Sequence, residues 1–145
     1  MIFKSMTLLS EEEREKYKLI IPKIQQVWWL RTPAANDEKR VRVVDDVFNE
    51  VFDFHHQLDN VSIRPCCVFE LVPDDPAYWK RPDLLIGSKV KHGRYTWTVL
   101  DIVFGNILAI CDTAVLDGAF DLKANAWETS EIKAWFDAKG EKIIT

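Results

Sequence analysis

Apolar and polar residues alternate along the middle of this chain, and this pattern restricts the fold more than any other feature of the sequence. Residues 40–43 read Arg-Val-Arg-Val, and residues 95–99 read Tyr-Thr-Trp-Thr-Val. A period of two separates polar from apolar side chains on a β-strand, because successive residues point to opposite faces. Gly105 and Asn106 then precede an apolar run at 107–111, which predicts a β-hairpin over residues 89–111.

Two further segments are predicted to be strands. Residues 26–33 are rich in β-branched and aromatic side chains and end at Pro33, which is typical of a short strand that enters a turn. The polar residues 34–39 follow as a loop. Residues 61–71 form an apolar run that we expect to be one central strand, with Pro65 at its start or at a bulge.

Two helices are expected, one near each end of the chain. Ser10 and Glu13 have the spacing of a capping box, so a helix should begin there. Pro22 interrupts the apolar stripe that follows, and this helix should end or kink near residues 19–21. A second helix is predicted over residues 131–137, capped by the residues just before it. Strands together with helices place the chain in the α+β class.

The length and composition fit one domain of this kind. The chain has 145 residues, close to the usual size of a single domain. Hydrophobic residues make up 48% of it, and six tryptophans supply enough apolar area for a well-defined core. Residues 73–87 are rich in Pro and Asp, and we interpret them as a connecting segment within one domain that spans residues 1–145.

The charge balance and the cysteines argue against several classes of protein. Nineteen Lys and Arg residues against 23 Asp and Glu residues leave a net charge of −4, which disfavours nucleic-acid binding. No stretch approaches the roughly 18 apolar residues that span a bilayer, and the first ten residues lack the apolar run of a signal peptide. We therefore expect a cytoplasmic protein with no membrane partner, in which Cys66, Cys67 and Cys111 are reduced thiols.

Two motifs go beyond these general patterns. One is Trp28-Trp29-Leu30-Arg31-Thr-Pro33, and the other runs from Trp127 and Glu128 to Trp135 and Phe136. They resemble the signatures W-W-L-R-S/T-P and W-E-x-S-x-I-R-x-W-L of a domain family of unknown function found in bacteria and their phages. Residues 61–65, which contain Arg64 and Pro65, and residues 93–101 are similar to that family's last and opening strands.

The order of these segments differs from the order in the family, because the family's last three segments come first here. The resemblance therefore implies a circular permutation, with Met1 and Thr145 side by side between two consecutive helices. Surface loops tolerate new termini of this kind. Members of the family are similar to the C-type-lectin-like fold, with mixed or antiparallel sheets flanked by two helices. That fold implies that residues 89–104 lie antiparallel beside residues 61–71.

The residues of the motifs have both structural and functional interpretations. Arg31 and Arg64 fit an anion-binding pair, but we favour two structural arginines, each paired with a carboxylate such as Glu128. For the tryptophans of the motifs, strand and helix periodicity favours core packing over an aromatic cage.

Metal and nucleophile chemistry are not indicated by the sequence. His55 and His56 are adjacent, so on a strand their rings should point to opposite faces and cannot bind one metal ion. The acidic cluster within residues 45–53 lacks a lectin-type calcium motif, and we interpret it as a solvated face. Neither a phosphate-binding loop nor a nucleophile elbow is present. We expect no cofactor, no metal and no enzymatic activity.

The remaining prediction is a small intracellular protein-binding module, encoded by a phage or prophage, whose partner is another protein. One form of it is an inhibitor of a host defence protein. The expected contacts lie in two loops: Asn36, Asp37 and Glu38 in one, and Tyr78, Trp79, Lys80 and Arg81 in the other. The alternative is a small-ligand-binding or enzymatic domain that uses the Arg31 and Arg64 region. We expect a monomer or a weak homodimer.

Overall fold

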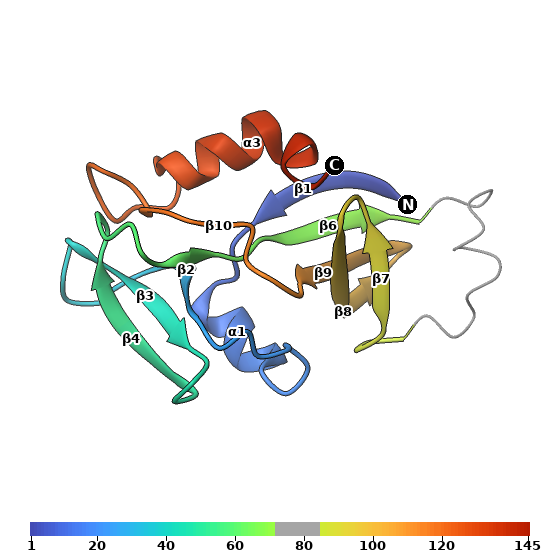
Figure 1. Cartoon of the computed structure of the whole chain (residues 1–145), viewed down its shortest axis with the longest axis horizontal. Coiled ribbons are helices and arrows are strands. Elements are labelled where there is room, and N and C mark those ends of the chain that lie inside the picture. Colours follow the sequence, from blue (N-terminus) through green and yellow to red (C-terminus); the bar gives the residue numbers. More distant parts are fainter. Residues whose placement is uncertain (72–84) are drawn as a thin grey trace.

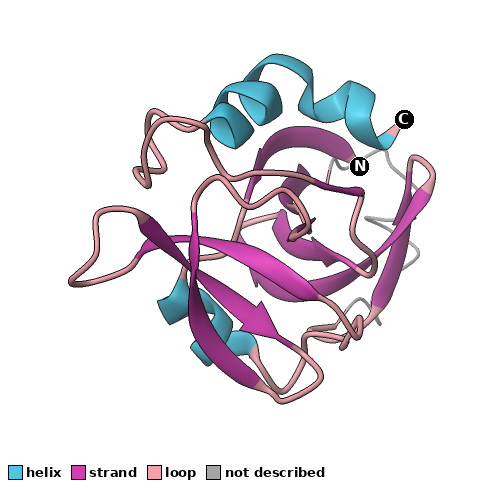
Figure 2. Cartoon of the chain, turned by 60° about the vertical axis from the view of Figure 1, so that its left-hand side comes forward, coloured by secondary structure: helices cyan, strands magenta, loops and turns pink. Residues whose placement is uncertain are grey.

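Two five-stranded sheets lie side by side in this α+β protein (Figure 1, Figure 2). The computed structural model describes residues 1–71 and 85–145. The first sheet is antiparallel throughout and has the order β1 (Ile2–Thr7), β6 (Cys66–Glu70), β9 (Asn106–Cys111), β8 (Tyr95–Val103), β7 (Lys89–His92). The second has the order β10 (Leu116–Asp117), β5 (Ser62–Ile63), β2 (Val27–Pro33), β3 (Arg40–Asp45), β4 (Glu50–His55). In the second sheet the β2–β5 pair is parallel and the other pairs are antiparallel.

The two helices within the described residues begin where the sequence predicts. Helix α1 (Glu11–Tyr17) starts with the expected capping box, since Ser10 Oγ accepts from the Glu13 amide and the Glu13 carboxylate accepts from the Ser10 amide. Helix α3 (Glu131–Ile144) is capped by Ser130 and is longer than predicted. Neither helix, nor any other in the described part of the chain, is long and apolar enough to cross a bilayer.

The core lies on both faces of the paired sheets. On one face, side chains from both sheets pack beneath α3, and Ile132 and Phe136 of that helix are among the buried residues. On the other face, Tyr17 of α1 packs with Trp28 and Leu30 of β2. Figure 1 shows α3 on one side of the strands and α1 on the other. The result is a layer of strands between two helices.

The segment over residues 61–71 is divided between the two sheets, which corrects the prediction of one central strand. Its first part is β5 in the second sheet, and its last part is β6 in the first sheet. The division falls at Arg64 and Pro65. Proline has no amide hydrogen to donate to a neighbouring strand, so pairing is readily broken there.

The predicted pairing of residues 89–104 with residues 61–71 is wrong. Strand β6 pairs with β1 on one side and with β9 on the other, so β9 separates it from β8. The tight turn at Phe104 and Gly105, both with positive φ, makes β8 and β9 neighbours. Strand β1, which we did not predict, takes the other edge of β6.

The two chain ends lie at the same end of the molecule (Figure 1, Figure 2). The turn between β7 and β8 is bonded to the last residue of α3, because the Arg94 amide donates to the carbonyl oxygen of Ile144 at 2.8 Å. Strand β1 follows Met1, so a strand stands between α3 and α1 where we expected a direct helix-to-helix connection.

Candidate functional site

The loop between β2 and β3 is held in one conformation by its own residues and by a side chain from far along the chain. The Asn125 side-chain amide donates to the carbonyl oxygens of Asp37 and Arg40, at 3.1 Å and 3.0 Å. The Asp37 carboxylate accepts from the Lys39 amide at 2.9 Å and pairs with the Arg40 guanidinium at 3.2 Å. These bonds leave the side chains of Asn36 and Glu38 exposed at the surface of the loop.

A groove of about 450 Å³ lies beside this loop, and we call it the acidic groove. Its charged lining residues are Glu11, Asp37, Asp53 and Arg42, which are three carboxylates and one guanidinium. Arg42 donates to Glu11 at 3.0 and 3.1 Å and to Asp53 at 2.8 Å. The bonds to Glu11, followed by those to Asp53, raise the pKa of Arg42 above its ordinary value. Arg42 therefore stays charged, and because Arg40 pairs with Asp37 from outside the lining, three carboxylates face two guanidinium groups at the groove.

Helix α1 reaches the acidic groove through its first residue. The Glu11 amide donates to Thr32 Oγ1 of β2 at 2.8 Å, which fixes the start of the helix against the strand. The capping box at Ser10 sets where this helix begins, so the local sequence also sets where the Glu11 carboxylate lies.

Of the predicted contact residues, the structure brings Asn36, Asp37 and Glu38 together on the loop beside the acidic groove. The other four, Tyr78, Trp79, Lys80 and Arg81, lie outside the described residues.

Arg31 and Arg64 occupy different environments, and neither is paired with Glu128. Arg31 is partly exposed, and its guanidinium contacts the Glu13 carboxylate at 2.5 Å and the Leu8 carbonyl oxygen at 2.6 Å. We expected a carboxylate partner, and for Arg31 the capping-box glutamate of α1 is that partner. Glu128 is exposed, on the segment that precedes α3.

Arg64 is completely buried at the junction of the two sheets. Its Nε donates to the Cys111 carbonyl oxygen at 2.7 Å, and its guanidinium lies 5.1 Å from the centre of the Trp28 ring. Asp46 is 3.9 Å away, and both terminal nitrogens of Arg64 lack a hydrogen-bond partner within the described residues. Burial lowers the pKa of Arg64 to about 10. The Arg64 side chain has no exposed surface.

Asp46 corrects the interpretation of residues 45–53 as a solvated face. It is 6% exposed, and its carboxylate accepts from the Ile24 amide at 3.0 Å and from Trp28 Nε1 at 3.1 Å. Nothing in the sequence of residues 45–53 distinguishes this carboxylate from its exposed neighbours. Its hydrogen-bond partners, Ile24 and Trp28, come from other segments of the chain.

The motif residues are placed mainly in the core. Trp28, Trp29 and Leu30 are fully buried, and Trp29 Nε1 donates to the Gly118 carbonyl oxygen at 2.8 Å. Pro65 is buried at the point where β5 ends and β6 begins. Trp127 and Trp135 are partly buried against Phe120 and Phe136.

The cysteines have the properties of structural residues. All three are buried free thiols, and burial raises the pKa of Cys66, Cys67 and Cys111. A thiol with a raised pKa is a poor nucleophile at neutral pH. In the described ranges 1–71 and 85–145, no three His, Cys, Asp or Glu side chains converge as a metal site would require.

The histidine pair contradicts the prediction that its rings point to opposite faces. The ring centres of His55 and His56 are 4.5 Å apart, with 30° between their planes. Strand β4 ends at His55, so the strict alternation of a strand does not extend to His56.

Comparison with known proteins identifies no relative. No family model matches the chain, no curated protein matches it, and no solved structure matches it. The fold shows the class of the protein, an α+β domain with two sheets. The resemblance to a bacterial and phage family with a lectin-like fold stays a prediction.

Proposed function

We propose that the chain is a small protein-binding module that contacts its partner through the loop over residues 34–39 and the acidic groove beside it. The observation that carries this proposal is a rigid, exposed loop next to a groove with three carboxylates and one guanidinium. Such a groove favours a partner segment that presents Lys or Arg side chains.

The rigidity of the loop supports this proposal on energetic grounds. Association loses free energy when a flexible loop must be ordered, and a loop that is already ordered avoids that loss. Asn125 orders this loop in the free protein, since it bridges the Asp37 and Arg40 carbonyl oxygens. Asn36 and Glu38 are then presented to a partner at low entropic cost.

The alternative was a small-ligand or enzymatic site at Arg31 and Arg64. It is disfavoured because the Arg64 guanidinium is not accessible. A substrate cannot reach a side chain with no exposed surface, and Arg31 is already occupied by Glu13. A phage or prophage inhibitor that binds a host defence protein is the specific form of the protein-binding proposal. An acidic surface that faces a cationic partner is compatible with that form.

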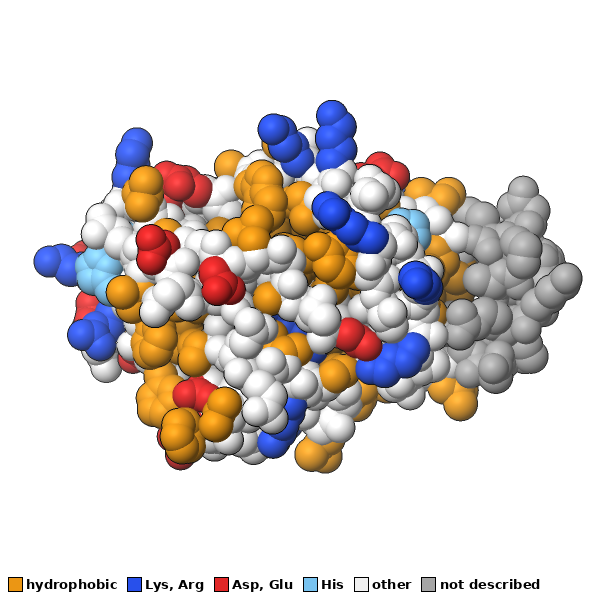
Figure 3. All heavy atoms as spheres, in the orientation of Figure 1, with side chains coloured by type: hydrophobic (Ala, Val, Ile, Leu, Met, Phe, Trp, Pro, Cys, Tyr) orange, Lys and Arg blue, Asp and Glu red, His pale blue; other side chains and the backbone are white. Residues whose placement is uncertain are grey.

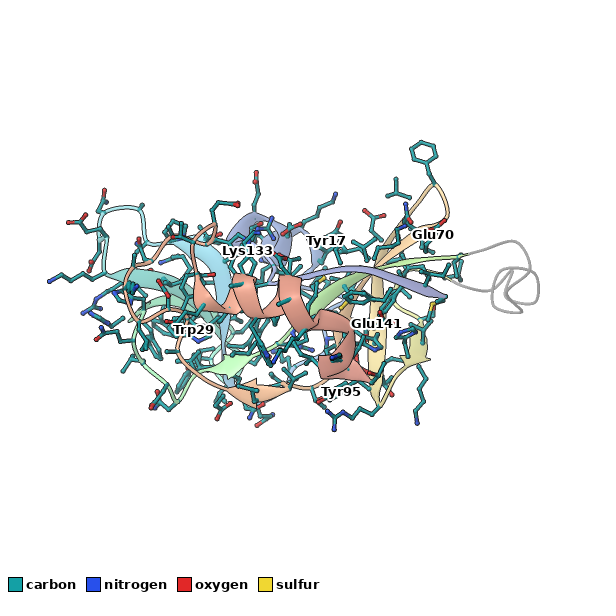
Figure 4. All side chains as sticks on the ribbon, turned by 90° about the horizontal axis from the view of Figure 1, so that it is seen from above. Tyr17, Trp29, Glu70, Tyr95, Lys133 and Glu141 are labelled. Atoms are coloured by element: carbon teal, nitrogen blue, oxygen red, sulfur yellow. The ribbon has the colours of Figure 1, made fainter. Side chains whose placement is uncertain are left out.

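The test compares two charge reversals in capture experiments from a lysate of the native host. Glu38→Lys changes an exposed loop residue that makes no structural hydrogen bond within the described residues. Glu141→Lys is the matched control, since Glu141 is exposed on α3 (Figure 4). We expect a protein that the wild type and Glu141→Lys capture equally and that Glu38→Lys loses. Equal capture by all three variants at low salt would contradict the proposal.

A further inference from the structure

A second hollow, of about 450 Å³, lies where the end of β4 meets the segment that leads to α3. Histidine and lysine side chains dominate its lining: Glu38, Lys39, His55, His56, Gln57, Lys123 and Ala124. Figure 3 shows a histidine among Lys and Arg side chains at this end of the molecule. We call it the histidine hollow.

The hydrogen bonds of the two rings determine where their protons lie. His56 Nδ1 is 2.7 Å from the Asp121 carbonyl oxygen, and because a carbonyl only accepts, His56 Nδ1 carries a proton. His55 Nδ1 accepts from the Gln57 amide at 3.2 Å, so the proton of the neutral ring is on Nε2. The two neutral rings therefore differ: His55 offers an N–H donor at Nε2, and His56 offers a lone pair at Nε2.

His56 gives the histidine hollow a hydrogen-bond acceptor beside its cationic groups. The residue is only 5% exposed, and Nε2 has no hydrogen-bond partner within residues 1–71 and 85–145. A reciprocal bond from the Asp121 amide to the His56 carbonyl oxygen, at 3.2 Å, holds this residue in place. Within the described residues, the solvent-inaccessible side-chain atoms without a partner are those of Arg64, so water reaches His56 Nε2, and a donor group of a ligand can replace that water.

The charge of the histidine hollow selects the ligand class. Lys39 and Lys123 are exposed and form no ion pair within the described residues, and Glu38 is the one carboxylate side chain among the lining residues. Two ammonium groups against one carboxylate repel a metal cation and attract an anion. The Gln57 side-chain amide donates to the Leu122 carbonyl oxygen at 2.8 Å, and this bond links the two segments that line the hollow.

We propose that the histidine hollow binds hydrogen phosphate, a tetrahedral oxyanion that keeps one hydroxyl group. Its oxygens accept from the Lys39 and Lys123 ammonium groups and from His55 Nε2–H. Its hydroxyl donates to His56 Nε2. Sulfate has the same shape and charge but no hydroxyl, so it cannot donate a hydrogen bond to His56 Nε2. The hollow shares Glu38 and Lys39 with the loop over residues 34–39, but none of its lining residues lines the acidic groove, and the proposal does not rest on the proposed function.

The experiment is a set of titrations by calorimetry at pH 8 and constant ionic strength, with inorganic phosphate, sulfate and phenyl phosphate. At this pH histidine is ordinarily neutral and a phosphate monoester is a dianion without a hydroxyl. We expect inorganic phosphate to bind about fivefold more tightly than either of the other anions, the net effect of one hydrogen bond. Sulfate reports on shape and charge, and phenyl phosphate separates free phosphate from an esterified source.

Three variants connect the binding to the residues of the hollow. Lys123→Met should weaken phosphate and sulfate alike, whereas Lys91→Met, a surface lysine outside the hollow, should change neither. His56→Asn keeps a donor for the Asp121 carbonyl oxygen and should abolish the preference for phosphate over sulfate. If His56→Asn does not fold, His55→Phe removes the Nε2–H donor of His55 while it keeps an aromatic ring, and it should weaken the binding of both anions.

Several results would overturn the proposal. They are no phosphate binding at millimolar concentration, equal affinity for phosphate and sulfate, equal affinity for phosphate and phenyl phosphate, and an unchanged phosphate affinity in Lys123→Met. Binding of Zn²⁺ with no binding of phosphate would assign the histidine pair to a metal and would equally overturn it.

Discussion

Arg42 and Arg64 both face carboxylates, yet the protein changes their pKa values in opposite directions. Arg42 is partly exposed and donates to three carboxylate oxygens, which raises its pKa. Arg64 is fully buried with Asp46 at 3.9 Å, and its pKa falls to about 10 because burial penalises the charge. Hydrogen-bonded partners outweigh desolvation at the surface, and desolvation outweighs a single distant partner in the core.

The two regions use charge in different ways. Near the surface, water stabilises Glu11, Asp53 and Arg42 if a partner displaces their mutual contacts, so the acidic groove can exchange partners at low cost. At the junction of the sheets, Arg64 and Asp46 have no such freedom, because each would be left as a charge without water. The first arrangement suits recognition, and the second suits a fixed structure.

The largest expected effect comes from removal of the buried carboxylate. Asp46→Ala deprives the Ile24 amide and Trp28 Nε1 of their acceptor and leaves the Arg64 charge without a counter-charge beside it. We expect a loss of about 3–5 kcal/mol in the free energy of unfolding, measured by urea denaturation. Adding Arg64→Met should recover much of that loss, since neither charge then remains. If Asp46→Ala lowers the free energy of unfolding by less than about 1 kcal/mol, Arg64 does not depend on its buried partner, and the proposed difference between the two arginines is wrong.

Tyr17 should give an intermediate effect that appears only at high pH. Burial, followed by its hydrogen bond to Asp101 at 2.9 Å, raises the pKa of Tyr17 to about 12. The folded state therefore keeps a proton that the unfolded chain releases above pH 10. This contribution to stability, about 2 kcal/mol, is complete below pH 10 and is lost as the pH rises through 12.

The measurement for Tyr17 is the slope of unfolding free energy against pH between 10 and 12. Tyr17→Phe lacks the titrating hydroxyl, so its stability should fall less steeply than that of the wild type over this interval. Identical slopes would show that the hydroxyl does not lose its proton on unfolding in this range.

The smallest effect is expected at the surface pair. Asp53→Asn weakens one of the two carboxylate partners of Arg42, and the pair with Glu11 remains. We expect a change in unfolding free energy of about 1 kcal/mol or less, and a smaller one at high salt. A loss as large as that of Asp46→Ala would mean that Arg42 is as dependent on its partners as Arg64.

Long-range pairing separates the parts of the fold that could be predicted from those that could not. The capping box at Ser10 and the turn at Gly105 act over a few residues, and the helix start and the β8–β9 hairpin followed from them. Strand β1 is a different case, because Ile2–Thr7 is a strand only where β6 lies beside it. A local sequence pattern cannot indicate which distant strand will pair with a given segment.

The candidate sites show the same division. The exposed loop over residues 34–39 was predicted from its polar composition, while the bridge from Asn125 that orders it spans 88 positions to Asp37. The histidine hollow was missed because the predicted strand alternation fails at His56, just after β4 ends.

Local sequence patterns were enough to predict the α+β class, the starts of both helices and most strands, because alternation, capping and turn chemistry are properties of neighbouring residues. Three other features became known only from the packed chain: the division of residues 61–71 between two sheets, the carboxylate partners of Arg31 and Arg64, and the close contact of the two histidine rings. These depend on burial and on contacts between segments far apart in the chain, and a side chain's environment exists only once those segments have packed.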